Sequence, residues 1–210
     1  MTSPTPTVIS ASFITGARSK EYIPDANLPE IAVAGRSNVG KSSLLRILLD
    51  NRKLVRVSQT PGRTREVNFF RVDTRELGSF VLADLPGYGY AKVPVSLKKE
   101  WGAFITRYLE ERQELITVVL LLDARREVRN EEKEFVMWLD QLGIPTLLVV
   151  TKIDKVSKTE RGAALQRIKR EMNLASLPLI FSAQTKEGLE AIWRKLSVAL
   201  ASVEESHVEP

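Results

Sequence analysis

GRSNVGKS, at residues 35–42, fits the pattern G-x-x-x-x-G-K-[ST]. It lies between an apolar segment at 31–34, which predicts a buried strand, and a segment at 41–49 whose leucines predict a helix. The glycines of such a loop allow a tight turn in which backbone N–H groups converge on a phosphate, and the helix N-terminus adds partial positive charge. The alternative is an accidental glycine turn, which the flanking strand and helix make the weaker interpretation. The loop therefore predicts nucleotide binding, with Lys41 bridging the β- and γ-phosphates and the Ser42 hydroxyl coordinating Mg²⁺.

A second motif, DLPGYGYAK at residues 84–92, follows the apolar segment 80–83 directly. Asp84, as the first residue after that strand, is expected to hold Mg²⁺ through water, and the Gly87 N–H to meet the γ-phosphate. Asp-x-Pro-Gly alone is a good turn sequence, but its place after a phosphate loop favours the metal and phosphate interpretation. The next residue is where Ras-type GTPases carry the glutamine that orients the attacking water, and here it is Tyr88.

The segment Thr151-Lys152-Ile153-Asp154 follows an expected strand at 145–150 and predicts recognition of guanine. Guanine presents two adjacent N–H donors that one carboxylate can accept, whereas adenine would leave the Asp154 charge unpaired. The stem of Lys152 can cover one face of the base. A charged turn would be the better interpretation of this segment alone. Ser182-Ala183, after a strand at 178–181, adds a backbone N–H near the guanine carbonyl oxygen.

Strands and helices alternate along the chain. The apolar, β-branched strands lack strict alternation and suit a mostly parallel sheet covered on both faces. We therefore predict an α/β fold with a mostly parallel six-stranded sheet and helices on both faces, in one domain over 1–210 with flexible tails at about 1–12 and 202–210. The strands are expected at 31–34, 67–72, 80–83, 116–122, 145–150 and 178–181, and the helices at 41–49, 96–112, 130–141, 158–172 and 187–200.

Composition restricts the class of protein. The chain has 210 residues, no cysteine and one histidine, which argues against disulfides, a thiolate metal site and histidine chemistry. No apolar run approaches the ~18 residues that a membrane span requires, and the N-terminus lacks the features of a signal peptide, so we expect a cytoplasmic protein.

A net charge of +5 and a pI of about 9.5 suit contact with a polyanion. The basic residues gather in clusters that are candidates for a phosphate-facing surface, and solvated helix faces are the equally open alternative. These clusters are Lys98-Lys99, Arg125-Arg126 with Arg129, and Arg167 with Lys169-Arg170.

Three stretches together, GRSNVGKSSL, SQTPGRTREVNFF (58–70) and DLPGYGYAKV, resemble the EngB family of bacterial GTPases, within the translation-factor-like P-loop GTPases. The resemblance extends over roughly residues 15–200. It implies a single GTPase domain, a role in assembly of the large (50S) ribosomal subunit, and a requirement in normal cell division and septation. The expected partners are the subunit or its precursor, through rRNA and ribosomal proteins. We expect a monomer without a membrane or DNA partner.

The resemblance also implies residue roles. Ser42 and Thr64 would ligate Mg²⁺, the segment 62–66 would form the first switch, and 84–87 the second. One departure is Thr151, where the general motif has asparagine, since a hydroxyl offers one donor where an amide offers two. The implied nucleotide-binding residues are Gly35, Arg36, Ser37, Asn38, Val39, Gly40, Lys41, Ser42, Gly62, Arg63, Thr64, Arg65, Glu66, Asp84, Leu85, Pro86, Gly87, Thr151, Lys152, Ile153, Asp154, Phe181, Ser182 and Ala183.

Hydrolysis is expected to be slow, with Lys41, Thr64 and Asn38 as the catalytic residues, because Tyr88 cannot readily replace a water-orienting glutamine. In some relatives, K⁺ held by an asparagine of the phosphate loop supplies charge at the phosphates. Asn38 occupies that place, and we hypothesise that it binds K⁺; the alternative is that Asn38 only shapes the loop. An arginine finger from Arg63 or Arg65 is less favoured, since these side chains could equally face rRNA.

Three functions compete at this point. The preferred one is a GTPase switch that binds a ribosomal precursor in its GTP form. The second is a regulatory GTPase that acts on a protein partner in cell division without ribosome contact. The third, a small-molecule P-loop kinase, is disfavoured by the Lys-x-Asp base reader at Lys152 and Asp154.

Overall fold

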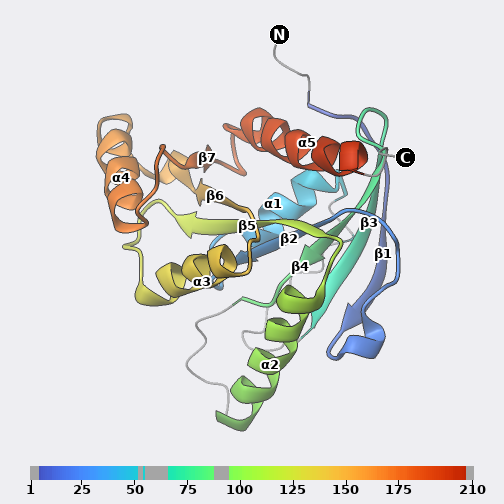
Figure 1. Ribbon diagram of the computed structural model, residues 1–210. Helices are drawn as coiled ribbons and strands as arrows, with labels where there is room; N and C mark the ends of the chain where they lie inside the picture. Colours follow the sequence, from blue (N-terminus) through green and yellow to red (C-terminus); the bar gives the residue numbers. More distant parts are fainter. Residues whose placement is uncertain (1–4, 52–53, 55–65, 88–94, 207–210) are drawn as a thin grey trace.

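The computed structural model describes residues 5–51, 54, 66–87 and 95–206, with the backbone alone at 95–101 and 204–206 (Figure 1). Its centre is a seven-stranded sheet in the order β1-β3-β4-β2-β5-β6-β7. Neighbouring strands are parallel from β4 through β2, β5 and β6 to β7. β3 is antiparallel to both of its neighbours, β1 and β4. The strands are β1 (Val8–Ala17), β2 (Glu30–Gly35), β3 (Val67–Thr74), β4 (Ser79–Asp84), β5 (Leu115–Asp123), β6 (Thr146–Thr151) and β7 (Leu179–Phe181).

The mostly parallel α/β fold is confirmed, but the prediction of six strands is wrong, because it omits β1. β1 is an edge strand that pairs antiparallel with β3, with Phe13 opposite Phe70 and their rings 5.6 Å apart. Residues 8–12, within the segment expected to be a tail, therefore belong to this strand. β1 interleaves Ser10, Ser12 and Thr15 with apolar residues and leaves most of its side chains exposed or half-buried, so it lacks the continuous apolar run of a strand buried on both faces. At the other end, the last helix continues to Ser206, into the segment expected to be a tail.

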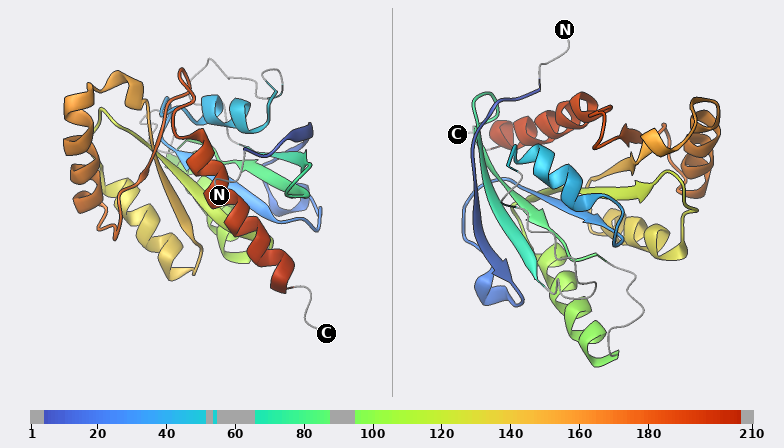
Figure 2. Two further views of the ribbon diagram at one scale, coloured as in Figure 1. Left: turned by 90° about the horizontal axis from the view of Figure 1, so that it is seen from above. Right: turned by 180° about the vertical axis from the view of Figure 1, so that it is seen from behind.

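Helices cover both faces of the sheet, as predicted (Figures 1 and 2). On β2, Ile31 and Val33 pack with α1 and α5, whereas Ala32 and Ala34 face the opposite side with α2, α3 and α4. None of the helices in the described part of the chain is both long and apolar enough to cross a bilayer. The helices are α1 (Lys41–Leu48), α2 (Val95–Glu111), α3 (Asn130–Gln141), α4 (Lys158–Glu171) and α5 (Leu189–Ser206), with 3-10 turns η1 (Lys20–Tyr22) and η2 (Ile153–Lys155).

The entry into α5 depends on a glycine. Gly188 has a φ of 84°, and a Cβ at this position would lie 1.8 Å from the carbonyl oxygen of Ile180 in β7. Ser182 N–H donates to the Glu187 carbonyl at 3.0 Å, which closes the loop between β7 and α5. The close approach at Gly188 therefore sets where α5 starts relative to the residues at the end of β7.

We predict that Gly188→Ala lowers the free energy of unfolding by about 2–4 kcal/mol, because alanine disfavours this φ and its methyl group overlaps a backbone oxygen. Gly162→Ala is the matched control: the same change inside α4, with nothing within 4 Å of the new Cβ. It should instead raise the free energy of unfolding by about 0.5–1 kcal/mol. Equilibrium urea unfolding at one saturating GDP concentration measures both, and coincident midpoints for the two variants would contradict the close approach.

Candidate nucleotide-binding site

The predicted site residues converge at the carboxyl ends of the parallel strands. β2, β4, β5, β6 and β7 all end there, since they are parallel, and loops at the carboxyl ends of such strands form the usual ligand crevice. The phosphate loop follows β2, Asp84 ends β4, Thr151 ends β6 and Phe181 ends β7. Four predicted residues of the first switch, Gly62, Arg63, Thr64 and Arg65, lie outside the described residues, as do Tyr88 and Tyr90.

Glu66, the described residue of that switch, precedes β3 and pairs with Arg18. Its carboxylate accepts from Arg18 Nε at 2.6 Å. Asn68 lies opposite Asp84, which places the start of β3 at the same edge of the sheet as the end of β4.

The phosphate loop presents unsatisfied backbone donors. Gly40 is the N-cap of α1 and makes no side-chain capping bond. Within the described ranges, no group accepts a hydrogen bond from the N–H of Gly40, Lys41 or Ser42. Unpaired N–H groups at a helix N-terminus are a ready site for an anion. The loop therefore has the donors that a nucleotide phosphate requires.

Lys41 and Asp84 form an ion pair through Lys41 Nζ and Asp84 Oδ1, with both side chains largely buried. One is the cation expected at the phosphates and the other the anion expected at hydrated Mg²⁺. Each group neutralises the charge of the other, and a magnesium–nucleotide complex brings a replacement partner for both. The charges at this position thus fit the expected ligand, and Ser42 lies in the adjacent first turn of α1.

The second switch begins against the phosphate loop. A Cβ on Gly87 would lie 2.9 Å from Ser37 Oγ and 3.1 Å from the Ser37 nitrogen. Leu85 N–H donates to the Val33 carbonyl at 3.0 Å, which continues the β2–β4 pairing past the end of β4. Residues 84–87 are thereby held beside residues 35–42.

Asp154 lies in η2, where the Ser182 hydroxyl donates to its Oδ1 at 2.7 Å. That hydrogen bond lowers the pKa of Asp154, so the carboxylate is ionised and ready to accept from two donors. Ser182 is fully buried and Ala183 is exposed, next to Asp154. The side chain of Ser182 therefore orients the carboxylate that is expected to read the base, and Ala183 beyond it is exposed.

Thr151 replaces the usual asparagine and still reaches the phosphate loop. Its Oγ1 lies 2.6 Å from the Val39 carbonyl oxygen and 3.0 Å from the Leu122 carbonyl oxygen. The hydroxyl has a single hydrogen and donates to one of these oxygens at a time. β6 is therefore tied to the phosphate loop by one buried hydrogen bond, as the one-donor chemistry of threonine predicts.

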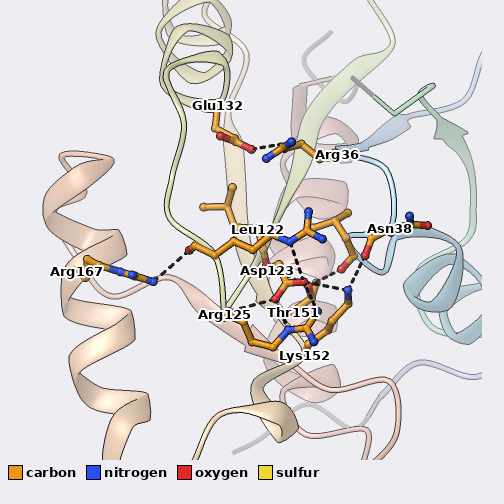
Figure 3. Close-up of polar contacts among 11 residues, drawn as sticks. Arg36, Asn38, Leu122, Asp123, Arg125, Glu132, Thr151, Lys152 and Arg167 are labelled. Carbon is orange, nitrogen blue, oxygen red and sulfur yellow. Dashed lines mark hydrogen bonds and ion pairs between the residues drawn. The ribbon is translucent and has the colours of Figure 1, made fainter. Parts of the chain in front are cut away.

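Sequence reasoning missed Asp123, at the end of β5. Its carboxylate accepts from Arg125 Nε and Nη2 at 2.9 and 2.8 Å and from Lys152 Nζ at 2.9 Å (Figure 3). Burial opposes ionisation, but these hydrogen bonds outweigh it and hold the pKa of Asp123 far below its usual range. Lys152 Nζ also donates to the Asn38 carbonyl at 2.5 Å. A signal was present, since Asp123, like Asp84, is a carboxylate that ends a buried strand.

Arg36 points away from the inner side of the loop. Its Nε lies 3.8 Å from Oε1 of Glu132 in α3, a buried carboxylate that also accepts from the Arg129 N–H at 2.6 Å (Figure 3). The Arg36 guanidinium therefore connects the phosphate loop to α3.

Comparison with known proteins agrees with this geometry. The family described as 50S ribosome-binding GTPase matches residues 30–152. The chain is 51% identical over 197 residues to "Probable GTP-binding protein EngB" of Syntrophotalea carbinolica, covering 93% of both chains. A crystal structure of a probable GTP-binding protein engB superposes with a TM-score of 0.65 at 23% identity, over 82% of this chain and 99% of that one. Era bound to MgGDPNP and nucleotides 1506–1542 of 16S ribosomal RNA superposes with a TM-score of 0.68 at 23% identity, over 81% and 56%.

We predict that Asp123→Asn weakens GDP binding by roughly tenfold or more, because hydrogen bonds to charged groups contribute about 1.5–3 kcal/mol and Lys152 loses one of its two anchors. Titration with a fluorescent GDP analogue measures the effect. Asp73→Asn is the control: Asp73 also accepts from an arginine and from hydroxyls, but it lies near the far end of β3. Equal GDP affinity in Asp123→Asn and wild type would show that Asp123 does not support the base reader.

Proposed function

The chain belongs to the EngB family of P-loop GTPases, and we propose that it is a GTP-dependent switch in assembly of the large (50S) ribosomal subunit, required for normal cell division and septation. The observation that carries this proposal is the match to 50S ribosome-binding GTPases over residues 30–152. That match contains the phosphate loop, Asp84 and Lys152, so it coincides with the site described above. The structure of Era with ribosomal RNA shows that this fold occurs in a protein that contacts rRNA.

In the proposed site, Lys41 and the free N–H groups of the phosphate loop bind the nucleotide phosphates. Mg²⁺, when bound, withdraws charge from the β- and γ-phosphate oxygens. Ser42 and Thr64 would be its protein ligands, and Asp84 would hold it through water. Asp154 accepts from the two N–H donors of guanine, and the Lys152 stem lies along the base. Since Tyr88 stands where a water-orienting glutamine is usual, these groups position the nucleotide well and the attacking water poorly, and hydrolysis is slow.

The proposal is tested by cosedimentation with purified 50S subunits. We expect more protein to sediment with 50S in a non-hydrolysable GTP analogue than in GDP, and less as KCl rises, because contacts to phosphates release counterions. The alternative is a GTPase that acts on a protein partner in division. Absence of 50S binding in either nucleotide at low salt would favour that alternative and overturn the proposal.

We also propose that the Asn38 side chain binds K⁺ during hydrolysis. Asn38 has a φ of 63°, and its carbonyl already accepts from Lys152, so its side-chain amide is the group left for another role. We expect GTP hydrolysis to be faster in KCl than in NaCl by roughly tenfold or more, since one contact to developing charge is worth at least about 1.4 kcal/mol.

Asn38→Gly separates the two roles considered for Asn38. Glycine adopts this φ freely, so the loop keeps its shape while the amide is removed. The variant should bind GDP normally and show no difference between KCl and NaCl in a phosphate-release assay. Equal rates in the two salts for the wild type, or full stimulation by potassium in Asn38→Gly, would contradict the proposal.

A further inference from the structure

Two basic clusters that are far apart in the sequence lie side by side in the fold. The Arg167 Nη2 atom in α4 donates to the Arg126 carbonyl at 3.1 Å (Figure 3). A short way further along each segment, Val128 N–H donates to Oε2 of Glu171 at 3.2 Å. The loop after β5 is therefore attached to the last turns of α4. We call the combined surface the α4 basic surface: Arg125, Arg126, Arg129, Arg167, Lys169 and Arg170.

Most of these cations have no anionic partner. Arg129, Arg167, Lys169 and Arg170 form no ion pair with any carboxylate in the described part of the chain. Two of the nearby carboxylates are engaged elsewhere: Asp123 binds Arg125 and Lys152, and Glu171 accepts from the backbone of Val128. The six cations of the α4 basic surface outnumber the carboxylates Glu127, Glu131 and Glu171 of the same segments, so the surface keeps an excess of positive charge. Arg129, Lys169 and Arg170 carry the part of this charge that no described carboxylate pairs with and no described backbone carbonyl holds.

The chemistry of the surface favours a phosphate polymer over a protein. Among the described residues, none of the large apolar side chains that are exposed lies in α4 or at 124–129. Protein interfaces usually bury an apolar centre, which this surface lacks. Guanidinium groups present planar pairs of N–H donors that match phosphate oxygens. Arginine-rich, apolar-poor surfaces of this kind suit the backbone of a nucleic acid.

We propose that the α4 basic surface binds the phosphate backbone of RNA. This rests on the proposed function, which supplies ribosomal RNA as the nucleic acid in question, and it names the surface that makes the contact.

The position of the surface determines how it responds to the nucleotide. β2 is central in the sheet. β3, which follows Glu66, and β4, which leads to Gly87, lie on one side of it, and β5, β6 and β7 lie on the other. The α4 helix is on the β5–β7 side, whereas Glu66 and Gly87 lie on the β3–β4 side. RNA binding by the α4 basic surface therefore contributes equally in the GTP and GDP states, while the switch side supplies the difference between them.

The test is the double variant Lys169→Gln/Arg170→Gln, which removes two charges and retains helix-forming residues. Its matched control is Arg194→Gln/Lys195→Gln, an adjacent, exposed basic pair in α5. Binding of a short fluorescein-labelled RNA duplex is followed by anisotropy across a KCl series, in GDP and in a GTP analogue. We expect the α4 variant to bind about tenfold more weakly in both nucleotide states, with the slope of log K against log salt reduced by about 0.9 for each phosphate that is no longer neutralised. The α5 variant should stay close to wild type.

Several outcomes would overturn the inference. An equal decrease in RNA affinity in both variants would mean that RNA responds to net charge alone. Tighter binding of poly-glutamate than of RNA, abolished by the α4 substitutions, would identify a surface for an acidic protein. GDP affinity and far-UV circular dichroism confirm folding, and Arg129→Gln repeats the test from the loop should the α4 variant fail to fold.

Cosedimentation with 50S separates this inference from the proposed function. If the α4 variant sediments with 50S as the wild type does, the ribosomal role stands and the α4 surface is excluded from it. If wild type binds the RNA duplex through this surface but never binds 50S, the surface stands and the ribosomal role fails.

Discussion

The nucleotide site depends on the attachment of the phosphate loop to the end of β6. Thr151 donates to the Val39 carbonyl or to Leu122, and Lys152 donates to the Asn38 carbonyl, so two adjacent side chains hold two adjacent loop carbonyls. A loop that leaves the N–H groups of Gly40, Lys41 and Ser42 free for a ligand is held in shape through its carbonyls, and the buried Val39 carbonyl in particular would be costly without a donor. The same segment of β6 leads into Asp154, the expected reader of guanine. One short piece of chain therefore holds the phosphate loop and carries the residue expected to recognise the base.

Much of this arrangement could be predicted from the sequence, because its parts are local patterns. The loop at 35–42 requires a strand before it and a helix after it, and buried apolar segments indicated the other parallel strands. Once the strands are parallel, their carboxyl ends meet at one edge, so the placement of Asp84, Thr151 and Phe181 follows from topology. The threonine at 151 could also be interpreted in advance, since the single hydrogen of a hydroxyl limits what it can hold.

What could not be predicted depends on contacts between distant segments. β1 has no periodic apolar pattern and is a strand because β3 offers it an open edge, which no local signal reveals. The position of Asp123 at the end of a buried strand marks it as a candidate, but its role becomes visible only when Lys152 and Arg125 are seen on its oxygens. Arg36 sits within the phosphate motif, yet its side chain turns to Glu132, because the buried carboxylate of α3 requires a cation. In each case the deciding contact is with another helix or strand, β3 for β1, the end of β6 for Asp123 and α3 for Arg36, and the spacing of residues in the sequence does not determine such a contact.

The order of strands in the sheet separates the two regions that the proposed GTP-dependent switch would use. Gly87 and the segment before β3 lie on one side of β2, so a change at the γ-phosphate acts first on that side. The base reader, Asp123 and α4 lie on the other side and are joined by Lys152 and by the loop at 124–129. A partner held on the α4 side would remain bound while contacts on the switch side form and break. Tyr88 stands at the position of the glutamine that orients the attacking water in Ras-type GTPases. In the proposed function, the lifetime of the GTP-bound state would therefore depend on another group, an ion or a partner, that completes the hydrolytic site. Under the proposed function, a contact on the α4 side that does not depend on the nucleotide, together with slow hydrolysis, would keep the protein on its partner while the partner changes conformation.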